Sequence, residues 1–413
     1  MANNMNQVRC RRRRRFGLIA AFALAGMTLA ACGSSSSDSG SGSGATLPIV
    51  IGLSVAETGG EAIPSLPTGY KEAVAEANAA GGLDVAGVHR KVDLITLDNR
   101  SDPSLMSQQV HTLVLQDHAV ALVSGCCDLD VAEAPLANAL KVPLVGTGIP
   151  TDLMTKVNGA YSWDASVSFS SLVTYLPKVI PALGPANKRV ALIADDNPQG
   201  QGENAIYEAL AQAAGYTVTE ASLVPVGTTD FSSFINKAKT TATDNLVVQM
   251  QSSDCFALWK QMKALGYQPK TAAANQCGAI PTWSTLGQLG NGAVVGMDWT
   301  PTSGLPDAAK LAAIFNKTYP NDVADQATAV NSYDAMEILF SAIERARSTD
   351  PAKINAAVKK TDASFPLGNV KFDSHNNWNG AFFYGQWQNG NVVQIYPEVP
   401  GVKAEFPVGG LGQ

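Results

Sequence analysis

The stretch Arg189–Gly202, RVALIADDNPQGQG, decides the fold class. Val190–Ala194 is an apolar run of strand length, and the polar, glycine-containing residues behind it lead into a helix predicted over Glu203–Ala214. A second strand is predicted at Thr217–Val224. A strand, a helix and a second strand in this order form a right-handed βαβ unit, which implies a parallel sheet.

The same alternation continues on both sides of this stretch. Further strands are predicted at Leu47–Val55, Val92–Leu97, Val120–Ser124, Val142–Val145, Leu246–Met250 and Thr271–Ala274, with Gly292–Trp299 leading back toward the first half and short strands near Val370, Phe382 and Val392. Helices are predicted around Tyr70–Ala77, Ser104–Gln116, Val131–Leu140, Asp230–Thr240, Phe256–Leu265, Ala308–Thr318 and Ala329–Ala346. Because 413 residues exceed what one core usually supports, we predict an α/β fold of two doubly wound parallel-sheet lobes.

The amino-terminal residues have the layout of an export signal. Arg11–Arg15 form a positive block, and Phe16–Ala31 form an apolar run that is short for a membrane span. The run ends in small residues before Cys32, which predicts a lipoprotein signal over residues 1–32 with Cys32 as the acylated residue. An ordinary signal peptide and a single membrane anchor are the alternatives, and the arginines allow either the Sec or the twin-arginine route.

Residues 33–46 are predicted to tether the lipid anchor to the folded part. Gly33–Gly44 is almost entirely Ser and Gly, a composition that cannot bury a core and behaves as a flexible linker. We therefore expect an exported protein, lipid-anchored at the outer face of the cell membrane or in the periplasm. The charged fraction of 15% and the net charge of -6 disfavour binding to nucleic acid or to a membrane surface through a basic face.

The cysteine content favours disulfides. Cys10 and Cys32 belong to the signal, which leaves four of the six cysteines in the folded part. In an oxidising compartment an even number favours pairing. The simplest arrangement joins Cys255 to Cys277 and forms a vicinal bridge between Cys126 and Cys127, and whether this second bridge forms stays open.

Catalytic and metal-binding motifs are missing from the sequence. It contains neither a Gly-x-Ser-x-Gly elbow nor a phosphate-binding loop ending in Gly-Lys-Ser/Thr. His111 and His118 have no further ligand at metal spacing, and Asp195-Asp196 follows a strand, where it is expected to orient the next turn. We predict that the protein is not an enzyme and needs no cofactor and no metal. A Cys126 or Cys127 nucleophile is the weaker alternative.

An ordered series of short motifs runs over nearly the whole chain after the tether. The motifs are Ile51–Gly59, Ala75–Gly82, Asp98–Pro103, Lys141–Leu144, Arg189–Asp196 with Gly200–Gly202, Thr229–Ser233 and Asn331–Ala335. Each alone is weakly specific, and the ordered set is strongly specific. With it the chain resembles the leucine/isoleucine/valine-type periplasmic binding proteins, the branched-chain amino acid receptors of ABC transporters with a type I binding fold.

This resemblance implies two lobes that close on a solute by a hinge motion. The first lobe would comprise residues 47–164 and 301–363, and the second residues 165–300 and 364–413, with three crossings between them. The implied partners are a small-molecule solute and an ABC permease with a separate ATPase, and the protein is expected to be a monomer. A sensory role with a signalling receptor is the first alternative function, and a cleft hydrolase is the second.

The resemblance also implies which loops bind the solute, because ligands of open α/β sheets bind at the carboxyl ends of strands. In the first lobe the family's serine maps to Asp130 or Leu129, and its threonine maps near Ile149 or Pro150. In the second lobe Gln199 stands where a tyrosine is common, and Asn275 or Gln276 stands where the family has an acid for the ligand ammonium. The complete candidate set is Glu57, Thr58, Cys126, Cys127, Asp128, Leu129, Asp130, Gly148, Ile149, Pro150, Phe169, Gln199, Gln251, Asn275 and Gln276.

The residue types at these positions depart from an amino acid clamp. Both hydroxyl positions of the first lobe have changed, and Asp128 and Asp130 would repel an anionic head group unless backbone N–H groups outweigh them. A neutral amide cannot replace the charge pairing of an acid. We interpret the set as binding a neutral or weakly polar solute, such as a non-standard amino acid, an amide or an aromatic compound. The alternative is that the loops have shifted and a standard amino acid binds through the backbone.

Overall fold

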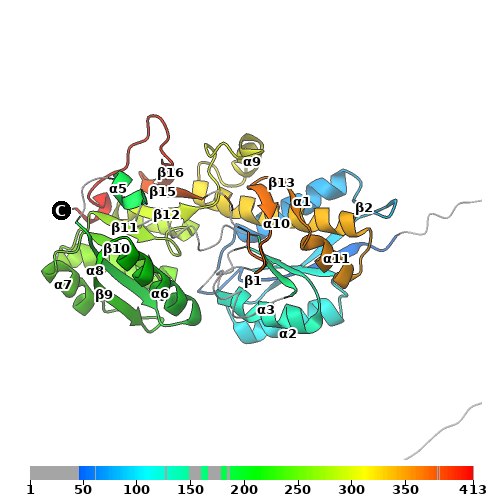
Figure 1. The fold of residues 1–413 in the computed structure, drawn as a ribbon, viewed down its shortest axis with the longest axis horizontal. Helices are drawn as coiled ribbons and strands as arrows, with labels where there is room; N and C mark the ends of the chain where they lie inside the picture. Colours follow the sequence, from blue (N-terminus) through cyan, green and yellow to red (C-terminus); the bar gives the residue numbers. More distant parts are fainter. Residues whose placement is uncertain are drawn as a thin grey trace, which may run out of the picture. The chain divides into compact units, whose positions relative to one another are not determined.

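The computed structural model describes residues 46–60, 62–125, 128–147, 160–165, 178–183, 187–378, 380 and 382–412 (Figure 1). Residues 46–413 form one compact unit. The predicted signal with Cys32 and most of the predicted tether therefore lie outside the described residues. No helix within the described ranges is long and apolar enough to cross a lipid bilayer.

The first sheet is parallel throughout and has the strand order β4-β1-β5-β6-β7. Its strands are β1 (Ile49–Val55), β4 (Val92–Asp98), β5 (Ala121–Val123), β6 (Leu144–Gly146) and β7 (Ser162–Asp164). Alternate β1 residues face opposite layers, as expected for a strand buried on both sides. Ile51 packs toward the layer with α1 (Leu66–Ala79) and α10 (Val323–Ala346), whereas Gly52 faces Leu113 on α2 (Pro103–Leu115). Helix α3 (Asp128–Leu140) packs beside α2 through Ala134 and Ala137.

The second sheet has the order β16-β15-β12-β11-β10-β8-β9. Its strands are β8 (Arg189–Asp195), β9 (Thr217–Val224), β10 (Asn245–Gln249), β11 (Thr271–Ala274), β12 (Ala293–Met297), β15 (Phe383–Gln388) and β16 (Asn391–Tyr396). The strands from β9 to β12 pair in parallel, and β15 and β16 are added antiparallel. Helix α6 (Pro198–Ala213) contributes Tyr207 to the layer on one face, and α8 (Ser252–Leu265) contributes Leu258 and Trp259 to the other.

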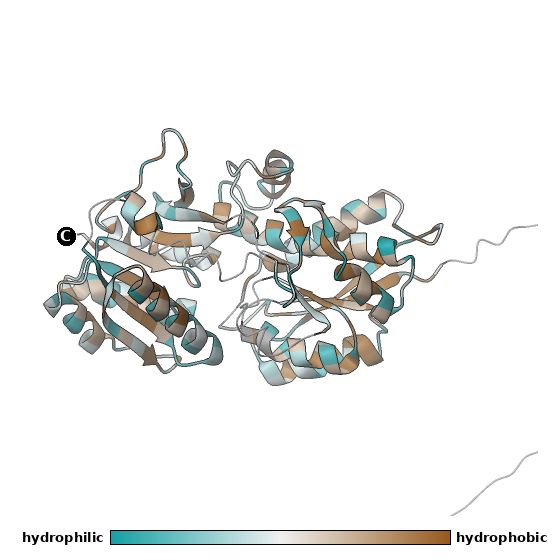
Figure 2. Ribbon diagram, viewed as in Figure 1, coloured by the Kyte–Doolittle hydropathy of each residue, from teal (hydrophilic) through white to brown (hydrophobic). Residues whose placement is uncertain are grey.

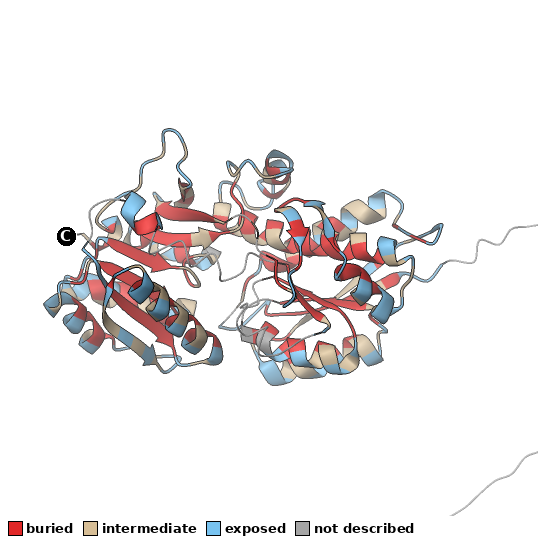
Figure 3. Ribbon diagram, viewed as in Figure 1, coloured by how far each residue is buried: buried red, intermediate tan, exposed pale blue. Residues whose placement is uncertain are grey.

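The burial pattern explains why these segments become the central strands. Figure 2 shows the apolar colour concentrated along the strands and the inner sides of the helices, and Figure 3 shows the same parts buried. In β8 every residue after Arg189 is buried, which is the signature of a strand covered on both faces. The mixed α/β architecture with parallel sheets confirms the predicted fold class.

Helices α7 (Ser232–Thr240) and α9 (Ala308–Phe315) and strand β14 (Gly368–Lys371) lie where a helix or a strand was predicted. Several short elements were not predicted from the sequence: β2 (Leu83–Val85), β3 (Val88–Arg90), α5 (Ile180–Leu183), the 3-10 helix η3 (Pro281–Gly290), α11 (Pro351–Val358), β13 (Asp362–Phe365) and η4 (Gly409–Leu411). Strand β7 was likewise absent from the sequence-based prediction.

Two segments that lead from the first sheet toward the second are hydrogen-bonded to each other. The Asp164 N–H, at the end of β7, donates to the Asn376 carbonyl at 3.0 Å, and the Trp378 N–H donates to the Asp164 carbonyl at 3.2 Å. The Asn376 side chain donates to the Ser162 carbonyl at 3.1 Å. The end of β7 and the segment after β14 are thus joined at an isolated parallel β-bridge between Asp164 and Asn377, which we call the ribbon at Asp164. The division of the chain into lobes at residues 164, 300 and 363 remains a prediction.

Candidate functional site

The loop after β1 is stabilised by Asp98 at the end of β4. The carboxylate of Asp98 accepts from the N–H groups of Glu57 and Thr58 at 3.1 and 3.2 Å and from the Thr58 hydroxyl at 2.7 Å. Burial alone would raise the pKa of Asp98, but hydrogen bonds from Thr58, Arg100 and Glu57 outweigh it and lower the pKa. Glu57 also forms an ion pair with Lys71 at 3.5 Å. The side chains of Glu57 and Thr58, two predicted site residues, are therefore engaged within the loop.

A buried polar group lies at the carboxyl ends of β5 and β6. The Tyr70 hydroxyl, from α1, donates to the Ser124 carbonyl at 3.0 Å, and the Ser124 hydroxyl accepts from the Thr147 N–H at 2.9 Å. Asp130, on the first turn of α3, is fully buried beside this group. Burial raises the pKa of the Tyr70 hydroxyl, and nearby Asp130 adds to the effect.

Glu133 was not singled out from the sequence. It lies one turn after Asp130 on α3, it is 1% exposed, and neither of its carboxylate oxygens has a hydrogen-bond partner within the described ranges. Burial, and then repulsion from Asp130, raise its pKa well above the usual range. Leu129 is also buried, so α3 presents two acids and one apolar side chain from its first two turns.

Several predicted first-lobe residues cannot be placed. Cys126, Cys127, Gly148, Ile149, Pro150 and Phe169 lie outside the described residues. Asp128 begins α3, and its side chain is outside the described part as well. For these positions the roles given above remain predictions.

In the second sheet, the turn after β8 is built around Asn197 and Gly200. The Asn197 side chain caps α6 by accepting from the Gly200 N–H at 2.7 Å. A Cβ atom on Gly200 would lie 2.1 Å from the Asp195 carbonyl oxygen, so only glycine fits here. This tight turn places Gln199 on the first turn of α6, where it is buried and donates its amide N–H to Glu203 at 2.6 Å.

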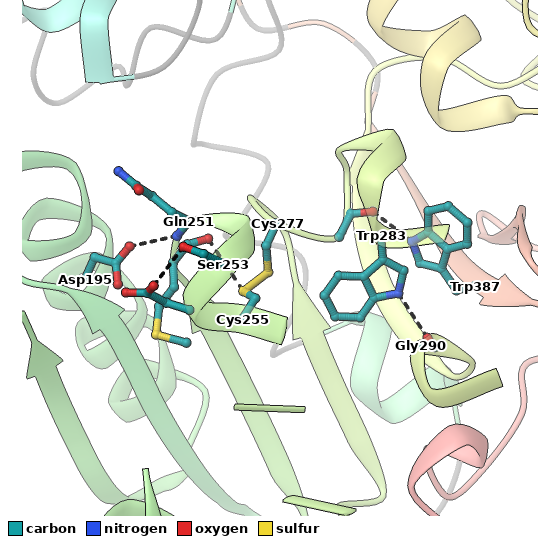
Figure 4. The surroundings of a disulfide bond; sticks show 11 residues. Asp195, Gln251, Ser253, Cys255, Cys277, Trp283, Gly290 and Trp387 are labelled. Atoms are coloured by element: carbon teal, nitrogen blue, oxygen red, sulfur yellow. Dashed lines mark hydrogen bonds between the residues drawn. A yellow bond between two sulfur atoms is a disulfide. The ribbon is translucent and has the colours of Figure 1, made fainter. Parts of the chain in front are cut away.

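The loop after β10 is joined to the end of β8. The Gln251 N–H donates to the Asp195 carboxylate at 2.7 Å (Figure 4). A Cβ atom on Gly60, in the loop after β1, would lie 3.8 Å from the Gln251 amide oxygen. Gln251 therefore connects the loops of β8 and β10 and lies next to the loop of β1.

Asn275, immediately after β11, is used inside the second sheet. Its amide N–H donates to the Tyr207 hydroxyl on α6, and its amide oxygen accepts from the Gly296 N–H at 3.0 Å. Both ends of this amide are therefore engaged within the second sheet, and Asn275 and the neighbouring Gln276 are both half-buried. The sequence did not reveal this contact, which joins residues 68 apart.

Gln249 is a further residue that sequence reasoning missed. It ends β10, it is 2% exposed, and neither atom of its amide has a hydrogen-bond partner within the described ranges. It lies on the same face of β10 as Val247, which packs in the layer with Tyr207. A buried polar side chain at the end of an apolar strand was the available signal.

A disulfide joins Cys255 on α8 to Cys277, two residues after Asn275 (Figure 4). This is the pairing expected from the cysteine count. Both cysteines are fully buried. The bond links the helix that begins after Gln251 to the loop that contains Gln276, and thereby holds two predicted solute-facing loops together. Nearby, the Trp387 indole donates to the Gly278 carbonyl at 2.8 Å and the Trp283 indole to the Gly290 carbonyl at 3.2 Å (Figure 4).

The buried Asp, Glu, Lys and Arg side chains in the described part of the chain are all acidic. They are Asp130, Glu133, Asp164, Asp195, Glu203, Asp254 and Asp334. All of them except Asp334 lie at the end of a strand or in the helix that follows it. Within the part of the chain that the structure describes, no group of three or more His, Cys, Asp or Glu side chains could hold a metal ion. The carboxyl ends of both sheets thus carry acids and amides.

A family model described as periplasmic binding protein matches residues 48–391. The chain belongs to the periplasmic binding protein family. This confirms the resemblance found in the motifs. As a periplasmic binding protein the chain has a curated relative in the Leu/Ile/Val-binding protein homolog 7 of Brucella abortus, which is 22% identical over 352 residues covering 81% of this chain and 87% of the relative.

Solved structures of other periplasmic binding proteins share the fold. A leucine-binding protein from Thermotoga maritima superposes with a TM-score of 0.73 at 20% identity, covering 84% of this chain and 97% of that one. An R. palustris ABC transporter solute-binding protein in complex with benzoate gives a TM-score of 0.72 at 15% identity, covering 84% and 95%. At these identities the likeness extends to the fold alone.

Proposed function

We propose that the protein is the solute-binding component of an ABC importer. It captures a small solute between the loops at the carboxyl ends of its two sheets and delivers it to a membrane permease powered by a separate ATPase. The observation that supports this most directly is the placement of Gln251. This residue joins the loops after β8 and β10 of the second sheet and lies next to the loop after β1 of the first.

Capture requires the two lobes to close. In this proposal residues 47–164 and 301–363 form the first lobe, and residues 165–300 and 364–413 form the second. The ribbon formed by Asp164 with Asn376 and Trp378 is part of the hinge. The solute stabilises the closed form because it contacts both lobes only in that form, and the permease then distinguishes the closed form from the open one. The proposal includes no catalytic step and no cofactor, and the protein acts as a monomer.

The solute is small and carries hydrogen-bonding groups. Relatives of the same fold are named for leucine and benzoate. Gln199, Gln251 and Gln276 supply amides at the second sheet, and the described first-sheet loops supply Asp130 and Leu129. A non-standard amino acid, an amide or an aromatic compound fits these groups.

Export and lipid anchoring complete the proposal. Cys32 is the acylated residue, residues 33–46 are the tether, and the folded unit stands on the outer face of the membrane. Replacing Cys32 by Ala should release the protein from the membrane fraction into the soluble fraction while leaving solute binding intact. Retention of the Cys32→Ala protein in the membrane fraction would contradict acylation at this residue.

The test of solute binding is thermal unfolding of the purified protein against leucine, isoleucine, valine, benzoate, benzamide and acetamide. A solute at a hundred times its dissociation constant should add about 2.7 kcal/mol to the free energy of unfolding. A shift by at least one of these solutes, with the solute recovered unchanged, supports capture. Chemical turnover of a bound solute would contradict the proposal and favour a hydrolase.

A further inference from the structure

We infer that the second sheet binds a neutral carboxamide group of the solute through the side chains of Gln249 and Gln199. This inference rests on the proposed function and deepens it, because it selects one chemical class from the solutes proposed above. A primary carboxamide is planar and uncharged, and it carries two N–H donors and one carbonyl acceptor. The two glutamine side chains offer the complementary set of groups.

The first step concerns the ends of the strands. Gln249 ends β10, and its register partner on β8 is Ala194. On the other side of β10, Val248 pairs with Ala274 of β11, so Asn275 follows beside Gln249. Neighbouring residues at the same register of a parallel sheet present their side chains to the same face. Gln249 and Asn275 therefore share one face of the second sheet.

The second step concerns the helix that covers this face. Asn275 donates its amide N–H to the Tyr207 hydroxyl on α6, so α6 is that helix. Gln199, Glu203 and Tyr207 are spaced four apart on α6, and their buried side chains form one row along it. Because α6 begins soon after β8 ends, Gln199 is the member of the row nearest the carboxyl ends of the strands. Gln249 thus points toward this row at the level where β10 ends.

The third step concerns hydrogen-bonding capacity. Gln249 is buried, and neither the nitrogen nor the oxygen of its amide has a partner within the described ranges. Gln199 donates its amide N–H to Glu203 at 2.6 Å, whereas its buried amide oxygen has no partner in the same part of the chain. One amide nitrogen and two amide oxygens are thus left to be satisfied. Buried polar groups without a partner are costly, so a ligand that pairs with them gains affinity.

The fourth step compares the groups that a solute could present. The carbonyl oxygen of a carboxamide accepts from the Gln249 amide, and its two N–H groups donate to the oxygens of Gln249 and Gln199, so all three protein atoms are paired. A carboxylate accepts from the Gln249 amide but has no proton for the two oxygens. An ammonium group donates to the two oxygens but leaves the Gln249 nitrogen without an acceptor. The match uses neutral groups only and is independent of the ionisation of Glu203.

The experiment measures affinities by titration calorimetry with compounds of matched shape. Benzamide is compared with benzoate, which is an anion, with benzylamine, which is a cation, and with acetophenone, which keeps the carbonyl but has no N–H group. Isovaleramide and isovalerate repeat the comparison on a branched aliphatic chain. We expect each amide to bind at least about tenfold more tightly than its matched compounds, because each of these leaves at least one buried amide atom unpaired.

Variants then assign the effect to a residue. Gln249→Met should weaken benzamide binding by about tenfold or more and reduce the preference for benzamide over acetophenone. The same variant should unfold in urea at an unchanged or higher midpoint, because an apolar side chain replaces a buried amide without a partner. Gln212→Met alters an exposed glutamine of the same helix and should change neither property. Gln199→Met should weaken benzamide binding about fivefold.

The outcomes separate this inference from the proposed function. If benzoate, benzylamine or acetophenone binds as tightly as benzamide, the inference is overturned and solute capture stands. A Gln249→Met protein that fails to fold, or that binds benzamide as tightly as Gln212→Met does, would show that Gln249 is structural. Binding of leucine, isoleucine or valine without binding of either amide would also overturn the inference alone. A protein that binds none of these compounds would overturn it together with the solute range proposed above.

Discussion

Replacing Asp334 by Asn should remove a large part of the pH dependence of stability. Asp334 lies within α10, is fully buried, and accepts from the Leu367 N–H at 2.9 Å. Burial raises its pKa to about 8, against a lowering contribution from the Leu367 N–H and a further raising contribution from Glu337 and Asp298. Asn keeps an acceptor oxygen for the Leu367 N–H but cannot ionise. The variant therefore measures the effect of ionisation at position 334.

The sign and the size follow from proton binding. An unfolded Asp releases its proton near pH 4, whereas the folded Asp334 holds it up to about pH 8. Between these values the folded state binds more protons, so the free energy of unfolding falls as the pH rises, by about 1.4 kcal/mol per pH unit. Between pH 5 and pH 7, Asp334 alone lowers the free energy of unfolding of the wild-type protein by about 2.7 kcal/mol.

The assay is urea unfolding at pH 5, 6, 7 and 8 for the wild type, Asp334→Asn and a control. The difference in free energy of unfolding between Asp334→Asn and the wild type should widen by about 2.7 kcal/mol between pH 5 and pH 7, in favour of the variant. The control Asp93→Asn removes one acidic charge equally, and Asp93 is exposed on β4. If the free energies of unfolding of Asp334→Asn and the wild type change with pH in parallel, the reasoning is refuted.

Three further perturbations test the packing around the candidate site. Replacing Cys255 and Cys277 together by Ser should lower the free energy of unfolding by about 3 kcal/mol in urea unfolding, because the bond closes a loop with a separation of 22 residues. Gly69→Ala should lower the free energy of unfolding by about 2 kcal/mol or more, because its Cβ would lie 1.8 Å from the Ala329 carbonyl oxygen. The control Gly202→Ala places its Cβ in open space on α6 and should leave the free energy of unfolding unchanged or raise it. Asn197→Ala should cost about 1 kcal/mol through loss of the α6 cap, and an unchanged melting temperature would contradict that role.

The fold could be predicted because its central strands are short apolar runs between helices. The prediction at Thr271–Ala274 coincides with β11, and Val190–Ala194 lies within β8. The hairpin β2–β3 could not be found in the same way, because three-residue strands show no periodicity. Helix α11 carried a readable signal, since Asp350 before Pro351 is a cap followed by a first-turn proline.

The candidate site could be predicted as a set of loops but not as a set of contacts. The order of strands indicates which loops meet, and Gln199 and Gln251 do lie at the ends of β8 and β10. Whether an amide is available depends on partners far away in the sequence, such as Tyr207 for Asn275. The burial of Glu203 within α6 is likewise set by tertiary packing, because an isolated helix would leave it exposed.

The ribbon at Asp164 has a mechanical consequence. The two segments can rotate about this contact without losing it. Sliding one segment past the other would break the hydrogen bonds of Asp164 with Asn376 and Trp378. In the proposed closure of the two lobes, these bonds would therefore favour rotation about Asp164 over sliding of one lobe past the other.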